Sequence, residues 1–265
     1  MRPIRVVVLE RAYGRYRPED FTPALLNLCS GLAVSVRVVG TVGRGWLLVE
    51  LSGEDVEVAV RLIDMEMGLA PVRPERLRKG SAVRGRISGL TGQGLHVDVA
   101  VFEPASLEAR VPLSALRAQL ADGHELDMGE LSELFCLAEN LPLEVRLLEE
   151  PSAALEEGRP VLAELSEGQV RQVESWVSCG LDRVLVIGAS HHALKRAVSS
   201  LKLYEHVASL GRLGLLENYL LLKLGAPTRR IVKKLRKRLR EALVLVFRPL
   251  RIAREFPGRY VGACL

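Results

Sequence analysis

The sequence predicts an α+β protein with a ferredoxin-like N-terminal domain, a central S1/OB-like β-barrel and a ferredoxin-like C-terminal domain. The order strand, helix, strand, strand, helix, strand occurs in both terminal parts of the chain and predicts the flanking domains. Five short strands with a helical insert before the fourth predict the barrel. We place the domains at residues 1–75, 76–165 and 166–250, with a tail at 251–265.

The N-terminal domain is expected to contain a strand at 4–9, a helix at 18–28, strands at 33–39 and 46–51, a helix at 54–67 and a short strand at 70–73. Residues 33–39 alternate valine with Ser35 and Arg37, which is typical of a strand with one apolar face. A turn at 43–45 predicts a hairpin, and Gly68 is a suitable residue to end the helix.

The barrel strands are expected at 80–87, 95–101, 108–112, 141–148 and 160–165, with a helix at 128–138 and a linker at 149–158.

The C-terminal domain is expected to contain helices at 166–179, 191–202 and 227–241, and strands at 183–187, 204–210, 215–224 and 243–247. Pro249 should then break the chain. In this topology both helices cover one face of the sheet, and we expect the other face to be free.

The most informative segment is the helix at 227–241, which separates apolar from basic side chains. Ile231, Val232, Leu235 and Leu239 share one side of the helix. The remaining surface carries eight cations: Arg229, Arg230, Lys233, Lys234, Arg236, Lys237, Arg238 and Arg240. No Asp or Glu lies between Asn218 and Glu241, so these cations repel one another. An external polyanion would relieve that repulsion, whereas the alternative is a solvated basic helix without a ligand.

Charge is strongly segregated along the chain. Residues 226–259 contain 12 Lys and Arg and two acids, a net charge of +10. Residues 119–167 contain 13 acids and two Arg, a net charge of −11. The basic end is expected to orient on an anionic partner. The acidic middle is a candidate surface for a protein partner.

Two short segments add candidate contacts. The loop 11–17 interleaves aromatic rings, which stack on bases, with guanidinium groups, which bind phosphates. Its candidate residues are Arg11, Tyr13, Arg15, Tyr16 and Arg17, and the alternative is that the tyrosines pack on a local core. Residues 188–192 lie between a strand and a helix, where amides bind phosphate, although N-capping by Ser190 is the simpler explanation.

The run 80–99 resembles an S1 module. Three further strings are DRVLVIG (182–188), LGLLE (213–217) and KLGA (223–226). On the basis of the run 80–99 and these strings, the whole chain resembles an archaeal family catalogued as a domain of unknown function. The S1 resemblance implies binding of RNA or single-stranded nucleic acid, with Arg84, Arg86 and His96 as barrel candidates. S1 modules usually carry an aromatic platform where this chain has Leu95 and His96. Base stacking would therefore lose its usual partner.

No nucleophile, GxSxG or HExxH pattern occurs, and the four cysteines lack CxxC spacing. We therefore expect no catalytic activity, cofactor or metal. No apolar run reaches the ~18–20 residues that a membrane span needs, and the N-terminal residues do not have the pattern of a secretory signal. We therefore expect a cytoplasmic protein that does not bind membranes.

The function predicted is that of a non-enzymatic RNA-binding protein, associated with ribosomal subunits or structured RNA. The alternative is a protein–protein adaptor or regulatory factor of a nucleic-acid machine such as RNA polymerase, acting through its sheets.

Overall fold

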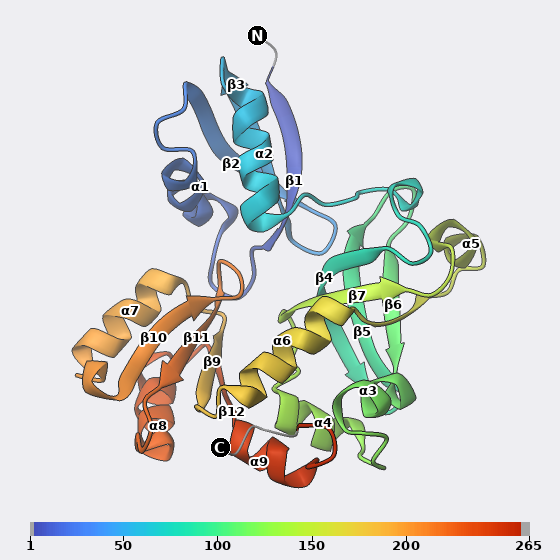
Figure 1. Ribbon diagram of the computed structural model, residues 1–265. Helices are drawn as coiled ribbons and strands as arrows, with labels where there is room; N and C mark the ends of the chain where they lie inside the picture. Colours follow the sequence, from blue (N-terminus) through green and yellow to red (C-terminus); the bar gives the residue numbers. More distant parts are fainter. Residues whose placement is uncertain (1–2, 261–265) are drawn as a thin grey trace.

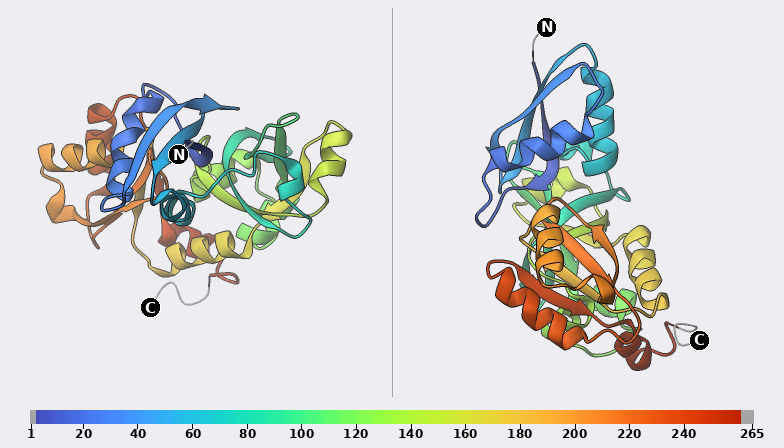
Figure 2. Two further views of the ribbon diagram at one scale, coloured as in Figure 1. Left: turned by 90° about the horizontal axis from the view of Figure 1, so that it is seen from above. Right: turned by 90° about the vertical axis from the view of Figure 1, so that its left-hand side faces the viewer.

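The computed structural model describes residues 3–260, which form three lobes (Figure 1). The N-terminal lobe lies above the C-terminal lobe, and the barrel lies beside both. Helix α6 (Glu167–Ser178) runs between the barrel and the C-terminal lobe. Figure 2 shows the same lobes from two further directions.

The N-terminal lobe is an antiparallel sheet in the order β1-β3-β2 with two helices packed on one face. Its elements are β1 (Ile4–Arg11), a 3-10 turn (Pro18–Phe21), α1 (Thr22–Leu28), β2 (Val34–Val42), β3 (Trp46–Gly53) and α2 (Val56–Met67). The predicted alternation in β2 is confirmed, because Val36 and Val38 are buried while Ser35 and Arg37 are exposed. The strand expected at 70–73 is reduced to isolated bridges at Leu69 and Val72. Pro71 lies within this segment and Pro74 follows it, and neither can donate to a β-ladder.

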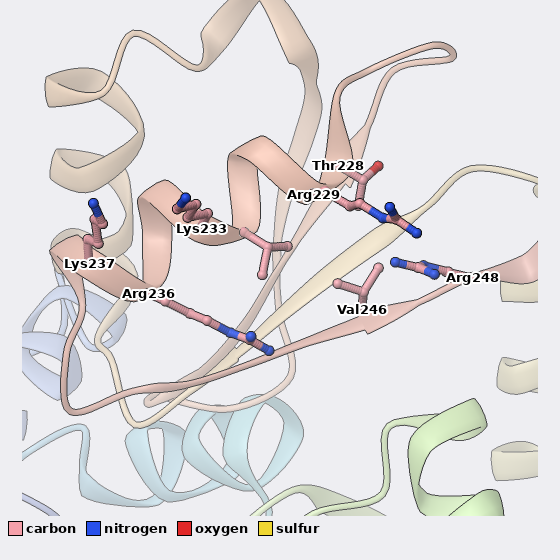
Figure 3. Close-up of a pocket in the computed structure, with 8 residues that line it drawn as sticks. Thr228, Arg229, Lys233, Arg236, Lys237, Val246 and Arg248 are labelled. Atoms are coloured by element: carbon pink, nitrogen blue, oxygen red, sulfur yellow. The ribbon is translucent and has the colours of Figure 1, made fainter.

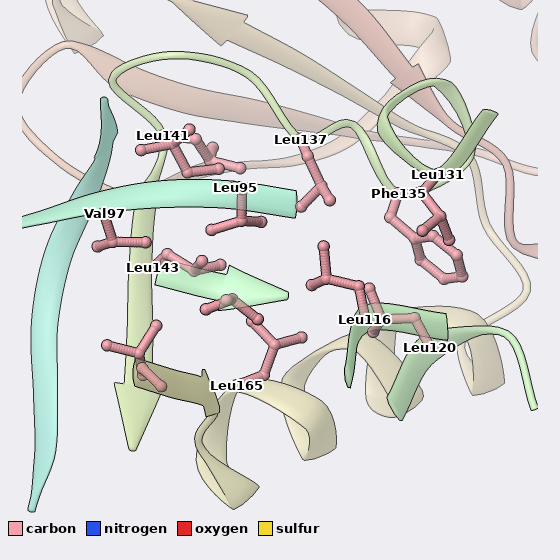
Figure 4. Packing of buried hydrophobic residues seen from close by; sticks show 14 of the residues in the cluster. Leu95, Val97, Leu116, Leu120, Leu131, Phe135, Leu137, Leu141, Leu143 and Leu165 are labelled. Atoms are coloured by element: carbon pink, nitrogen blue, oxygen red, sulfur yellow. The ribbon is translucent and has the colours of Figure 1, made fainter. Parts of the chain in front are cut away.

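The central lobe is a closed five-stranded barrel in the order β4-β5-β6-β8-β7, consistent with an OB-like barrel. Its strands are β4 (Ala82–Thr91), β5 (Gly94–Val101), β6 (Leu107–Pro112), β7 (Pro142–Leu147) and β8 (Val161–Leu165). Leu95, Val97, Leu143 and Leu165 converge in its interior (Figure 4). Two helices, α3 (Leu113–Leu120) and α4 (Met128–Phe135), follow β6, and the sequence had indicated only the second. The expected linker contains a short helix, α5 (Pro151–Glu156).

The C-terminal lobe is a four-stranded antiparallel sheet in the order β10-β11-β9-β12. Its elements are β9 (Arg183–Ile187), α7 (His191–Ser200), β10 (Val207–Arg212), β11 (Glu217–Leu222), α8 (Thr228–Arg238), β12 (Leu243–Phe247) and α9 (Pro249–Glu255). Short 3-10 turns lie at Pro74–Arg76 and Tyr204–His206. Helices α7 and α8 pack on one face through Leu194, Ile231 and Leu235.

The expectation that the other face of this sheet is free is wrong. Leu185 and Phe247, each 1% exposed, join the core that continues into the barrel. Trp176 of α6 lies over this face, with its ring centroid 5.6 Å from Tyr219 and 5.4 Å from Phe247. Pro249 begins α9 instead of breaking the chain, because proline is well suited to the first helical turn.

Candidate nucleic-acid interface

The basic segment forms α8, an amphipathic helix on the outer side of the C-terminal sheet. Ile231, Val232, Leu235 and Leu239 are between 0% and 9% exposed and pack in the core beneath the helix. Burial of these side chains stabilises α8 despite the mutual repulsion of its cations. The predicted apolar face is confirmed.

The cations of α8 point away from that core and lack acidic partners. Seven of the eight predicted cations lie in α8, which ends at Arg238, and Arg240 follows it. All eight are exposed except Lys234, which is half-buried. Within residues 3–260, no carboxylate forms an ion pair with any of them. Arg236 donates from Nη2 to the backbone oxygen of Val244 at 2.9 Å. The charge of α8 is therefore uncompensated in the part of the chain that the structure describes.

A groove of about 470 Å³ lies between α8 and β12 (Figure 3). It is lined by Arg229, Lys233, Arg236, Lys237, Arg248, Thr228, Val232 and Val246. The guanidinium groups of Arg229 and Arg248 extend toward the same end of the groove. Sequence reasoning missed Arg248, because it follows β12 and lies outside the helical pattern.

A second hollow of about 210 Å³ continues the groove toward α4 and α9 and shares Arg236, Val246 and Arg248 with it. Arg251 also lines this hollow, but it pairs with Glu133 at 2.7 Å and Glu255 at 2.9 Å. The free positive charge of this hollow therefore comes from Arg236 and Arg248.

Most of the ion pairs that the acidic middle segment forms within the described residues join it to arginines of the barrel itself. Ion pairs join Arg117 to Glu125 at 2.9 Å, Arg159 to Glu149 at 2.5 Å, and Arg146 to Glu164. Within the described residues, Glu133–Arg251 is an ion pair between this segment and the basic end, and it does not involve α8. The acidic segment therefore does not neutralise the basic helix.

The loop 11–17 divides into buried and exposed parts. Arg15 and Arg17 are exposed, and Arg15 lies 3.4 Å from the Glu241 carboxylate. The hydroxyl of half-buried Tyr16 accepts a hydrogen bond from the Ser190 amide at 3.0 Å. This contact places Arg15 beside the start of α7 and the end of α8, a proximity that the sequence did not predict.

Arg11 and Tyr13 were predicted to contact nucleic acid; the burial of Arg11 contradicts this, whereas Tyr13 is half-buried. Arg11 is 5% exposed, pairs with Asp98 and lies 4.2 Å from the centroid of the Trp46 ring. Burial raises the pKa of Asp98 and lowers that of Arg11. The hydroxyl of Tyr13 donates to Glu217, and burial raises the pKa of Tyr13. Both side chains serve the contacts between lobes.

The three barrel candidates occupy different environments. Arg84 is exposed and lies 3.7 Å from Glu144. His96 is one-quarter exposed, with Nδ1 3.5 Å from Glu108. Neighbouring Leu95 is 0% exposed and fills the barrel interior, so β5 offers no stacking surface at that position. Arg86 is 2% exposed, and its prediction as an RNA contact is wrong.

Arg86 instead joins the three lobes. Its guanidinium pairs with Glu10 of β1 and Glu217 of β11. Burial acts to lower the pKa of Arg86, but the two carboxylates outweigh it and raise that pKa. At Gly214, an added Cβ would clash with Glu217 Oε2 and lie 2.7 Å from Arg86 Nη2. A side chain at this position of the LGLLE string would therefore displace the buried ion pairs.

The segment 188–192 caps α7, as the simpler explanation predicted. Ser190 is the N-cap and accepts a hydrogen bond from the Ala193 amide at 3.3 Å. His191 Nδ1 lies 3.0 Å from Asn218 Oδ1, and burial lowers the pKa of His191. These contacts account for the polar residues without a ligand.

Residues 3–260 contain no cluster of three or more His, Cys, Asp or Glu that could hold a metal ion. In the same range, every helix is too short or too polar to cross a bilayer. Cys264 lies outside the described residues. No family model matches the chain, and no curated protein matches its sequence.

Proposed function

We propose that this chain is a non-enzymatic RNA-binding protein, associated with ribosomal subunits or structured RNA, that holds phosphates along α8. The observation that supports this most directly is that the seven cations of α8, and Arg240 just after it, have no carboxylate partner within the described residues. Arg248 adds a ninth charge on the opposite side of the groove. A groove lined by cations on both sides suits a phosphate backbone.

The chemistry of the groove favours recognition of the backbone over recognition of bases. None of the described residues that line the α8–β12 groove or the adjoining hollow is aromatic. Proteins that bind single strands generally stack bases on aromatic rings. We therefore assign double-stranded or folded RNA as the ligand class, bound with little sequence preference.

We assign the C-terminal lobe, and the three-stranded N-terminal lobe, to the ferredoxin-like class. The strand order β10-β11-β9-β12 and the two helices on one face support this for the C-terminal lobe. We also assign the barrel to the S1/OB type and the chain to the archaeal family that it resembles, with a cytoplasmic location.

The adaptor alternative retains one supporting surface. The acidic middle segment exposes Glu125, Glu133 and Glu167, whose side chains are 88%, 72% and 75% exposed. Docking through the C-terminal sheet is disfavoured, because both faces of that sheet are covered. A protein partner would therefore bind at the barrel end of the molecule.

The test is charge reversal at Arg229, Arg230 and Lys233, which are exposed and point away from the core. With six phosphates neutralised, log K for duplex RNA should fall with log salt at a slope of about −5. The triple Glu variant should lose most of its affinity and have a shallower slope, measured by fluorescence anisotropy.

The matched control reverses Arg61, Arg76 and Arg78, which are exposed, make no ion pair with a described residue, and give the same change in net charge. This control should retain the wild-type slope. Equal losses in both triple variants would show that only net charge matters and would contradict binding at α8. Both variants should keep the wild-type circular dichroism spectrum.

A further inference from the structure

A separate hollow of about 420 Å³ lies at the carboxyl end of α8. Three segments distant in sequence form it: the loop 11–17, the start of α7 and residues 237–242. It shares Lys237 with the α8–β12 groove. Its volume lies in the range of small-molecule sites.

The hollow is strongly positive. Five cations line it: Arg15, Arg196, Lys237, Arg238 and Arg240. Glu241 is the acid that lines it, so the local net charge is +4. Glu241 lies 3.4 Å from Arg15, and both side chains are more than half exposed. An exposed pair of this kind contributes little and leaves Arg15 available.

The fold alone explains only part of this cluster. Lys237 and Arg238 lie in the last turn of α8, where the helix dipole favours cations. Arg196 lies in the middle of α7, and Arg15 lies in a loop, so neither gains from a helix end. Tyr16 places Arg15 here through its hydrogen bond with Ser190. Three separate segments thus bring like charges together.

The cationic side chains provide the binding groups, because two amides at the start of α7 are already occupied. The Ser190 amide is already bonded to Tyr16, and the Ala193 amide is bonded to Ser190. Gly188 forms part of the floor with φ +90°, a conformation that side chains rarely adopt. An added Cβ at Gly188 would make ordinary van der Waals contact, 3.7 Å from the Glu241 backbone oxygen and from Tyr13 Cε2.

We propose that this hollow binds a terminal phosphate group, carried either by an RNA end or by a free nucleotide. A phosphate monoester carries about 1.5 to 2 negative charges at pH 7, whereas an internal phosphodiester carries one. A local charge of +4 in a concave site therefore favours a terminal phosphate over the backbone. The RNA-end form of this inference rests on the proposed function, and the free-nucleotide form does not.

The test compares one RNA hairpin with hydroxyl groups at both ends, with a 5′-phosphate and with a 3′-phosphate, together with ADP by calorimetry. A phosphorylated end should bind about tenfold more tightly than the hydroxyl form. The variant with both Arg15→Gln and Arg196→Gln should lose that preference. The control with Arg229→Gln and Lys233→Gln should keep it while binding all three RNAs more weakly.

The outcomes separate the two proposals. If the hydroxyl RNA binds, the phosphorylated RNAs gain nothing and ADP does not bind, the terminal-phosphate site is overturned and the RNA-binding function stands. If no RNA binds but ADP binds and the Arg15/Arg196 variant loses it, the site stands with a free nucleotide as ligand and the RNA-binding function falls. A phosphate preference that survives in the Arg15/Arg196 variant would also overturn the site.

Discussion

At the scale of single residues, Arg86 shows that a cation predicted to bind a ligand can instead join parts of the fold through buried ion pairs. It is buried between Glu10 and Glu217, which belong to different lobes. Replacing Arg86 with Met would leave two buried carboxylates without their cation. We expect Arg86→Met to lower the free energy of unfolding by about 3–5 kcal/mol, measured by urea denaturation.

The matched control is Arg84→Met on the same strand. Arg84 is exposed, and its nearest carboxylate is 3.7 Å away. Such a surface pair contributes about 0–1 kcal/mol, so this variant should unfold close to the wild-type midpoint. Similar losses in the two variants would contradict the assigned role of Arg86.

Glu10 gives the same junction a dependence on pH. Burial raises the pKa of Glu10 to about 7, Arg86 opposes the rise, and Glu217 adds to it. The folded state therefore keeps a proton that the unfolded chain releases near its ordinary pKa of 4.5. The resulting stabilisation is fully present below pH 4.5 and is lost as the pH rises toward and through 7.

Glu10→Gln removes this titration, because it replaces the carboxyl group with an uncharged amide of similar shape. Urea midpoints measured from pH 4.5 to 8 should fall with pH more steeply in the wild type than in Glu10→Gln. If both proteins show the same fall, another group is responsible.

At the scale of elements, local patterns predicted most of the structure. The apolar spacing of α8, the alternation in β2 and the strands of the barrel all depend on neighbouring residues, and the structure agrees with them. Pro249 was wrongly predicted to break the chain, because proline can end a helix as well as begin one. The choice between those roles depends on α9 packing beside α6, a contact that no local pattern contains.

The candidate site was predictable to a similar extent. The cations of α8 follow from the sequence, because a helix must expose whatever its apolar face does not bury. The burial of Arg11 and Arg86 does not follow, since their partners Asp98, Glu10 and Glu217 are distant in sequence. For the same reason, the sequence could not bring Arg15, Arg196 and Arg240 into one hollow.

At the scale of the whole molecule, the lobes share cores. The barrel core continues across α6 into the C-terminal sheet. Leu216, 1% exposed, extends from the loop before β11 into the core of the N-terminal lobe. Shared burial of this kind couples the stability of one lobe to that of its neighbours.

The two tryptophans of the chain lie at different junctions, so they can test this coupling. Trp46 is 0% exposed on β3 and donates to Asp98 of the barrel at 3.3 Å, while Trp176 packs between α6 and the C-terminal sheet. Trp46→Phe leaves Trp176 as the fluorescence reporter, and Trp176→Phe leaves Trp46. In each variant we expect the urea transition measured by fluorescence to coincide with the transition measured by circular dichroism. Each variant serves as its own reference, because either substitution alone shifts stability. A fluorescence midpoint that precedes the circular dichroism midpoint would mean that the lobe at that junction unfolds independently, because two-state unfolding requires all probes to agree.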